Sequence, residues 1–217
     1  MNHDITDMVF IIDRSGSMEG LEKETVQGFN SMLNKQMESV NVTTVLFDDE
    51  VEELYYRKKL CDVREMTENE FFVRGCTALL DAMGRTIYKM IVSQRKDKSK
   101  PDKIIFVIIT DGLENASREY TYGSVKKLIQ KQKGMGWEFF FLGANMDAVR
   151  EAADIGISSD RSVTFYNDSA GVALNYEVIG KTLHTMRMES SEQKKLDASW
   201  KNDIEVYYRK IKHNVLS

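Results

Sequence analysis

Three short polar segments contain the side chains that could bind a ligand. They are residues 13–17 (DRSGS), 75–77 (GCT) and 110–112 (TDG). Five of their side chains, two carboxylates and three hydroxyls, could converge on one ligand, and ligand sets made of oxygen alone suit hard cations such as Mg²⁺. The sequence therefore predicts a cation site built from five residues: Asp13, Ser15, Ser17, Thr77 and Asp111.

The elements that would position these segments alternate between strands and helices. Continuous apolar runs at 8–12, 104–109 and 139–142 predict strands, and the lack of polar alternation indicates a sheet covered on both faces. Amphipathic patterns predict helices at these positions: 21–37, 79–91, 125–134, 148–155 and 172–188. Such alternation predicts an α/β fold, a doubly wound, mostly parallel sheet with helices on both faces.

One segment breaks this alternation. Residues 41–47 and 51–60 both have strand character, and they meet at Asp48–Asp49–Glu50. We interpret them as a hairpin, which makes one strand antiparallel and places it at an edge of the sheet.

The predicted sheet would bring the polar segments together. Parallel strands end at a shared edge, where α/β proteins form their binding sites. Residues 13–17 directly follow the strand 8–12, and residues 110–112 follow the strand 104–109. With these two strands as neighbours, the five candidate ligands converge. The turn at 48–50 and Glu114 would make this edge negative, which favours a cation.

The pattern Asp13-x-Ser15-x-Ser17, followed by Thr77 and by Thr110–Asp111–Gly112, resembles the metal-ion-dependent adhesion site of the von Willebrand factor A domain. The resemblance extends over roughly residues 4 to 188 and matches in order and strand context. Cys76 departs from it, since many members have a glycine there, but this position is not a ligand. The chain also resembles stand-alone bacterial and phage members, including those linked to tellurite-resistance operons.

This resemblance implies the Rossmann-like fold of the family and a bound Mg²⁺ (or Mn²⁺). It implies that Ser15, Ser17 and Thr77 hold the ion directly, and that Asp13 and Asp111 act either directly or through water. An exchangeable coordination position would accept an Asp or Glu side chain of a partner protein.

Simpler interpretations exist for several of these residues. Asp13 and Ser15 are also preferred helix caps. We expect Arg14 to be a solvated charge, although pairing with a nearby acid or contact with a partner is an alternative. Cys76 is expected to be a small packing residue rather than a reactive thiol.

Composition limits the remaining possibilities. The chain has 217 residues, a net charge of −4, two cysteines and three histidines. An acidic chain is a poor candidate for nucleic-acid binding, and so few cysteines exclude a disulfide scaffold. The run 104–109 is too short for a membrane span, and the first residues lack a signal-peptide pattern. We therefore expect a cytoplasmic protein with no membrane contact.

We expect one domain over residues 1–190 and a C-terminal helical extension over 191–217. One face of this extension is apolar, and packing on its own domain is favoured over binding a partner. This apolar face consists of Trp200, Ile204, Tyr207, Tyr208 and Ile211.

The sequence favours a non-enzymatic, Mg²⁺-dependent module that captures a partner carboxylate. One alternative is a regulatory subunit of an AAA+ ATPase or of a stress-resistance complex of the tellurite type. A metal-dependent hydrolase is less favoured, because no histidine that could act as a general base belongs to the three segments. The partner, the pathway and the oligomeric state stay open.

Overall fold

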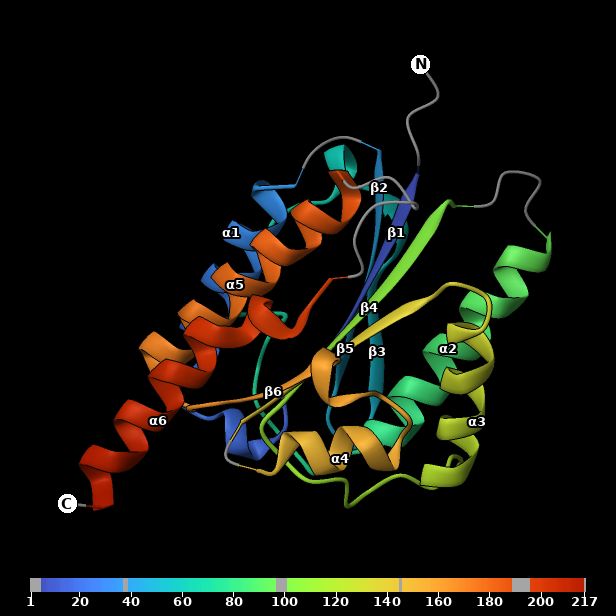
Figure 1. The fold of residues 1–217 in the computed structure, drawn as a ribbon. Coiled ribbons are helices and arrows are strands. Elements are labelled where there is room, and N and C mark those ends of the chain that lie inside the picture. The colour runs from blue at the N-terminus through green and yellow to red at the C-terminus, as the bar shows by residue number, and fades with distance from the viewer. Residues whose placement is uncertain (1–4, 37–38, 97–100, 145, 189–195, 217) are drawn as a thin grey trace.

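The computed structural model describes residues 5–36, 39–96, 101–144, 146–188 and 196–216. Its centre is a six-stranded sheet with the strand order β3-β2-β1-β4-β5-β6 (Figure 1). The strands are β1 (Thr6–Asp13), β2 (Val40–Phe47), β3 (Val51–Lys59), β4 (Lys103–Thr110), β5 (Glu138–Ala144) and β6 (Ser162–Phe165). Only the β2–β3 pair is antiparallel, and β3 forms an edge. The predicted fold class and its antiparallel edge strand are confirmed.

In the described part of the chain, six α-helices cover both faces of the sheet. They are α1 (Glu22–Asn34), α2 (Leu79–Lys96), α3 (Tyr122–Lys133), α4 (Ala148–Asp154), α5 (Ser169–Met188) and α6 (Asn202–Leu216). Helices α1, α5 and α6 lie on one side, and α2, α3 and α4 lie on the other (Figure 1). The first helix was predicted to extend to residue 37. It ends at Asn34, and residues 37–38 lie outside the described residues.

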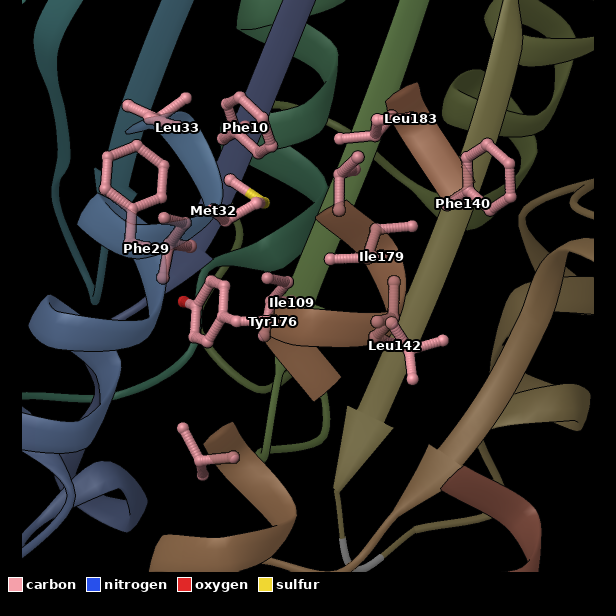
Figure 2. Close-up of a cluster of buried hydrophobic side chains, with 14 of the residues drawn as sticks. Phe10, Phe29, Met32, Leu33, Ile109, Phe140, Leu142, Tyr176, Ile179 and Leu183 are labelled. Atoms are coloured by element: carbon pink, nitrogen blue, oxygen red, sulfur yellow. The ribbon is translucent and has the colours of Figure 1, made fainter. Parts of the chain in front are cut away.

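The two hydrophobic cores explain the continuous apolar runs. Successive side chains of a strand point to opposite faces, so Phe10 packs against α1 on one side while Val9 and Ile11 join the other core. Figure 2 shows the first core, in which Phe29 of α1 and Ile179 of α5 lie over the sheet. The runs 8–12, 104–109 and 139–142 are therefore apolar at successive positions because both of their faces are covered.

Strand β6 was not predicted from the sequence. It has only four residues, and its sequence SVTF alternates polar and apolar side chains. It pairs in parallel with β5, with Leu142 opposite Val163. Because β6 is an edge strand, it needs no continuous apolar run and gives a weak sequence signal.

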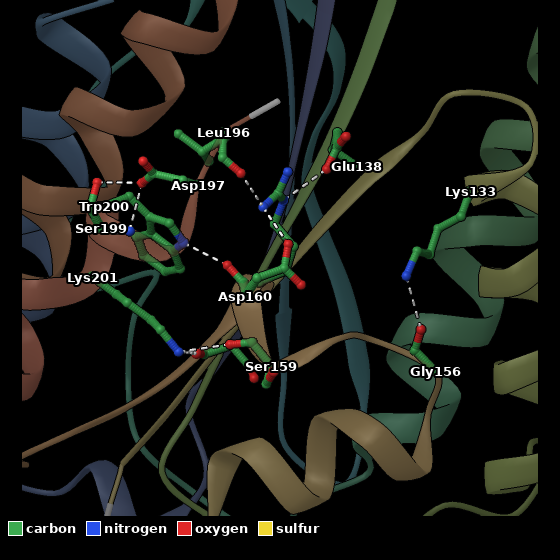
Figure 3. Close-up of polar contacts among 12 residues, drawn as sticks. Lys133, Glu138, Gly156, Ser159, Asp160, Leu196, Asp197, Ser199, Trp200 and Lys201 are labelled. Atoms are coloured by element: carbon green, nitrogen blue, oxygen red, sulfur yellow. Dashed lines mark hydrogen bonds and ion pairs between the residues drawn. The ribbon is translucent and has the colours of Figure 1, made fainter. Parts of the chain in front are cut away.

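The C-terminal segment packs on its own chain. The ring of Trp200, in the 3₁₀ helix Ala198–Lys201, contacts Phe140 edge-on at 5.2 Å, and its Nε1 donates to Asp160 O at 2.8 Å (Figure 3). The Lys201 ammonium donates to the carbonyls of Ser159 and Ser162 at 2.7 and 2.9 Å. The predicted domain boundary at 190/191 falls within 189–195, outside the described residues, and stays a prediction.

Among the helices of the described residues, none has both the length and the apolar character needed to cross a bilayer. The cytoplasmic location stays a prediction.

Substitution in a covered strand should unfold the protein. Ile108 of β4 is fully buried in the second core, so Ile108→Asp would place an unpaired charge among apolar side chains, at a cost of several kcal/mol. Val206→Asp on α6 is the matched control, because Val206 is 60% exposed. We expect circular dichroism to show a cooperative melt for Val206→Asp and none for Ile108→Asp. Native-like melting of Ile108→Asp would contradict the described core.

Candidate metal centre

The predicted site residues lie at the carboxyl edge of the two central strands. β1 and β4 are parallel neighbours, with Ile12 opposite Ile109. Asp13 is the last residue of β1, and Asp111 directly follows the last residue of β4. Thr77 lies two residues before α2, on a loop whose Gly75 carbonyl accepts the Gly16 amide at 3.3 Å.

Four of the five predicted side chains form a continuous chain of oxygen contacts. Thr77 Oγ1 donates to Ser15 Oγ at 3.1 Å, and Ser15 Oγ lies 3.2 Å from Ser17 Oγ. Ser17 Oγ in turn donates to Asp111 Oδ1 at 2.5 Å. The structure therefore brings together residues that are far apart in the sequence: Ser15 and Thr77 are separated by 62 residues, and Ser17 and Asp111 by 94.

Asp13, the fifth predicted residue, is fully buried next to this row of oxygen contacts. Its Oδ1 accepts the Ser15 amide at 2.7 Å, and its Oδ2 accepts the Thr110 hydroxyl at 2.5 Å. Ser15 is the N-cap of the 3₁₀ turn Gly16–Met18, but its side chain makes no capping hydrogen bond. Its hydroxyl faces Ser17 and Thr77 instead, so the capping interpretation is wrong for Ser15.

Burial makes the negative charge of the site costly. It raises the pKa of Asp13 to about 6, against the opposing effect of hydrogen bonds from Thr110 and Ser15, and the charge of Asp111 adds to the rise. Burial also raises the pKa of Asp111, although Ser17 and Asn167 donate to its carboxylate. Two buried carboxylates thus share a site whose hydrogen-bond donors are neutral.

The donor set fits a small, hard cation. A Cβ built on Gly112 would lie 2.7 Å from Thr77 Oγ1, 3.4 Å from Ser17 Oγ and 3.6 Å from Ser15 Oγ, so three hydroxyls border one small volume. Oxygen donors with nearby carboxylates are what Mg²⁺ and Mn²⁺ prefer. The described residues contain no cluster of three or more His, Cys, Asp or Glu side chains suited to a metal. The hydroxyls therefore make up most of this donor set.

The loop after β4 fixes the position of Thr77. Asn115 Oδ1 accepts the Thr77 amide at 2.9 Å, and the Asn115 amide donates to the Thr77 carbonyl at 3.0 Å. Glu114, which was expected to contribute to an acidic rim, accepts the Leu80 amide at 2.9 Å in the first turn of α2. A carboxylate at a helix N-terminus is stabilised there, so Glu114 supports the loop that carries Thr77.

The expectation that Arg14 is a solvated charge is wrong. Its side chain is fully buried, with Nε 2.9 Å from Asp48 Oδ2 and Nη1 2.8 Å from Glu52 Oε2. Arg74 Nε also contacts Asp48 Oδ2 at 2.9 Å. This arrangement arises because β1 pairs with β2, with Asp13 opposite Phe47, so the hairpin turn lies against residue 14.

These arginines make the edge less acidic than predicted. Burial alone would raise the pKa of Asp48, but hydrogen bonds from Arg74, the Glu50 amide and Arg14 hold it below its usual range. Arg74 Nη2 also pairs with Glu50 Oε2 at 2.6 Å. The turn at residues 48–50 therefore has its own cations, whereas the donors that reach Asp13 and Asp111 from the described residues are neutral.

Gly75 and Cys76, next to Thr77 in the same loop, have different environments. Gly75 has φ of +67°, a backbone conformation that favours glycine, and a Cβ there would force the Asp49 side chain to move. Cys76 is exposed. Its interpretation as a packing residue is therefore wrong, and its thiol faces solvent.

Two functional-site contacts had no signal in the sequence. Asn167, in the loop between β6 and α5, donates from Nδ2 to Asp111 Oδ2 at 2.9 Å. Asn115 acts across 38 residues to hold Thr77. Isolated asparagines in loops follow no periodicity or spacing, and only the folded chain shows what they contact.

Comparison with known proteins identifies the family. The family model of the von Willebrand factor type A domain matches residues 7–177. The chain belongs to this family. Its β1-to-α5 region accounts for nearly all of the matched type A domain. No curated protein matches the sequence.

Solved structures share the type A domain fold. The von Willebrand factor domain of the type V pilus tip protein Mfa5 from Porphyromonas gingivalis is 12% identical, with a TM-score of 0.65, over 89% of this chain and 99% of that chain. Proximal thread matrix protein 1 from the mussel byssus, with a zinc-occupied MIDAS motif, is 14% identical, with a TM-score of 0.58, over 83% of this chain and 46% of that chain. Manganese-loaded TRAP protein of Plasmodium vivax is 14% identical, with a TM-score of 0.55, over 79% of this chain and 72% of that chain. The match spans about half the length of the mussel protein. At these identities the likeness concerns the fold.

The raised pKa of Asp13 predicts how the metal-free protein responds to pH. A carboxyl whose pKa is higher in the folded than in the unfolded state stabilises the fold most below the unfolded pKa, and this contribution is lost as pH rises through the folded pKa. The folded value is about 6 against an ordinary 3.8. Between about pH 4 and pH 7, wild-type protein in EDTA should lose on the order of 3 kcal/mol of unfolding free energy relative to Asp13→Asn.

Urea unfolding of both proteins at a series of pH values measures this difference. Asp13→Asn keeps the size of the side chain and removes its charge, so the charge alone differs. Identical pH profiles would show that Asp13 carries no buried charge in the folded state.

Proposed function

We propose that this chain is a protein-binding module that depends on a divalent cation. Mg²⁺ (or Mn²⁺) is the ion that best suits the oxygen ligands, and the residues that would hold it are Asp13, Ser15, Ser17, Thr77 and Asp111. The observation that carries the proposal is the chain of side-chain oxygens from Thr77 to Asp111, with contacts of 2.5 to 3.2 Å, beside a second buried carboxylate. A cation supplies the positive charge that these two carboxylates lack.

The relatives with metal support the same proposal. The mussel protein has a zinc-occupied MIDAS motif and the Plasmodium protein is manganese-loaded. This chain shares their fold, and its oxygen ligands converge at the carboxyl edge of the sheet, where proteins of this architecture place their sites. Since zinc and manganese both occur in relatives, the choice of Mg²⁺ rests on the hard, oxygen-only ligands of this chain.

The ligand set suits capture of an acidic side chain. Neutral hydroxyls withdraw little of the charge of an ion, which therefore keeps its attraction for a further anion. Ser17 is exposed, so the oxygen chain reaches solvent at that residue. A carboxylate of a partner protein has the charge and the oxygen donor that such a position accepts.

The surroundings favour binding over hydrolysis. The groups that hydrogen-bond to the site from outside the five residues include the Thr110 hydroxyl and the amides of Asn115 and Asn167. These groups do not take up a proton at neutral pH, whereas a hydrolase needs a general base near the ion. We therefore propose a non-enzymatic role. A regulatory subunit of an AAA+ ATPase or of a stress-resistance complex would use the same contact with a different partner.

Metal binding should stabilise the folded protein. A ligand that binds only the native state at ~100 times its Kd adds about 2.7 kcal/mol to the unfolding free energy. We expect millimolar Mg²⁺ to raise Tm and EDTA to reverse the rise. Asp111→Asn removes one charge and keeps the side-chain size, so it should melt normally but respond little to Mg²⁺. Superimposable wild-type melting curves in Mg²⁺ and EDTA would refute the metal site.

Partner binding should depend on the same ion. Immobilised wild-type protein should retain its partner from a native lysate in Mg²⁺, and should release it in EDTA. The Ser15→Ala/Ser17→Ala variant, which loses two hydroxyl ligands, should fail to retain it. Acid-to-amide scanning of the captured protein should find one Asp or Glu that matters far more than its neighbours, because one contact to the ion dominates. Equal capture in EDTA would mean that another surface recognises the partner.

A further inference from the structure

Asn167 makes a direct contact with the metal centre from outside the sequence motif. It lies in the loop between β6 and α5, and its Nδ2 donates to Asp111 Oδ2 at 2.9 Å. The other oxygen of the same carboxylate, Oδ1, accepts from Ser17. Both carboxylate oxygens of Asp111 therefore have a donor, and Asn167 fixes the rotation of this carboxylate about its own axis.

The second polar atom of the Asn167 amide has a different environment. Asn167 Oδ1 is buried and has no hydrogen-bond partner within the described part of the chain. Buried acceptors are nearly always paired in native proteins, so this atom points to a donor outside the described residues. Water molecules that Mg²⁺ retains when it binds to a protein are donors of this kind.

The C-terminal helix holds the loop on both sides of Asn167. Tyr207 of α6 donates from its hydroxyl to Asp168 Oδ2 at 2.9 Å. The ring of Tyr208, the next residue of α6, lies 6.4 Å from the ring of Tyr166. The residues immediately before and after Asn167 are thus each in contact with α6.

The same loop is also fixed to the start of α5. Asp168 Oδ1 accepts the Gly171 amide at 2.7 Å. A Cβ on Gly171 would lie 2.0 Å from the Tyr166 carbonyl oxygen, which shows how closely the turn is packed. Little freedom remains for the backbone of Asn167, and the Gly171 amide and the Tyr207 hydroxyl together hold the Asp168 side chain.

Helix α6 has a rigid base from which to make these contacts. The 3₁₀ helix that precedes it is held to the sheet edge by Trp200 and Lys201, as Figure 3 shows. Arg161 Nη1 donates to the Leu196 carbonyl at 3.0 Å and so holds the start of the same segment. The position of Tyr207 is therefore determined by contacts that do not involve the metal centre.

We propose that Asn167 is a positioning residue of the metal centre and that helix α6 holds it in place through the Tyr207–Asp168 hydrogen bond. Asn167 Nδ2 orients the Asp111 carboxylate, and Asn167 Oδ1 would offer an acceptor to a water molecule carried by a bound cation. The inference rests on the proposed metal-binding function and adds a residue and a helix that the sequence motif does not contain.

Calorimetric titration with Mg²⁺ tests this inference. Residues that orient metal ligands typically change metal affinity by about 10- to 100-fold when replaced, so Asn167→Ala should weaken Mg²⁺ binding by that factor. Tyr207→Phe removes one hydroxyl and keeps the ring, and should weaken binding about fivefold, as the loss of one hydrogen bond implies. Tyr208→Phe is the matched control, since its contact with Tyr166 is through the ring, and it should bind Mg²⁺ like wild type.

A double variant and a melting experiment separate positioning from general stability. If Tyr207 acts through Asn167, Tyr207→Phe should cause no further loss of Mg²⁺ affinity in the Asn167→Ala background. Tm in EDTA reports stability without the metal. A Tyr207→Phe variant with a lower Tm in EDTA but wild-type Mg²⁺ affinity would overturn the role of α6.

The outcomes also distinguish this inference from the proposed function. Wild-type protein that binds Mg²⁺, with unchanged affinity in Asn167→Ala, would overturn the inference and leave the metal-binding function intact. Wild-type protein that shows no Mg²⁺ binding would overturn the proposed function and, with it, the inference.

Discussion

Two carboxylates held out of water at the ends of neighbouring strands are the constraint around which this edge of the molecule is organised. The parallel pairing of β1 and β4 places Asp13 and Asp111 at neighbouring strand ends, and burial raises the pKa of both. Burying a charge is costly without a partner. Every donor that reaches them within the described contacts is a neutral amide or hydroxyl, and a divalent cation would supply what these donors do not.

In the adjoining turn, residues 48–50, a buried negative charge is instead paired with positively charged side chains. Asp48 is also buried, but Arg14 and Arg74 both contact it, and its pKa lies below the usual range. The paired turn is a rigid support, because Arg14 also accepts the Arg74 amide at its carbonyl and so joins the loop that leads to Thr77 to the end of β1. Asp48, which is paired with arginines, thus lies near Asp13 and Asp111, which have neutral donors among the described residues. The second pair has the character of a cation site.

The fold itself is shared widely, at 12–14% identity with the pilus, mussel and Plasmodium structures. A fold common to such different proteins says little about partners, so the function of this chain has to be argued from its site. The C-terminal segment of this chain lies beyond residues 7–177, which the family model matches. It covers the β6 edge through Trp200 and Lys201, and it ends in a helix that contacts the loop of Asn167. The far edge of the sheet is in this way connected to the candidate metal site.

Local patterns in the sequence were sufficient for the fold class, the antiparallel hairpin and the grouping of the three polar segments, because apolar runs and the polar residues that directly follow them are visible within short stretches of the chain. The metal-ligand assignment stays a prediction. The patterns failed at β6, whose four residues lack a buried-strand signal, at Arg14, whose acidic partner is 34 residues away, and at exposed Cys76. They gave no indication of Asn167, which reaches Asp111 across 56 residues. Charge pairing and amide contacts depend on which loops meet in space, and that is set by how the sheet brings distant strands together.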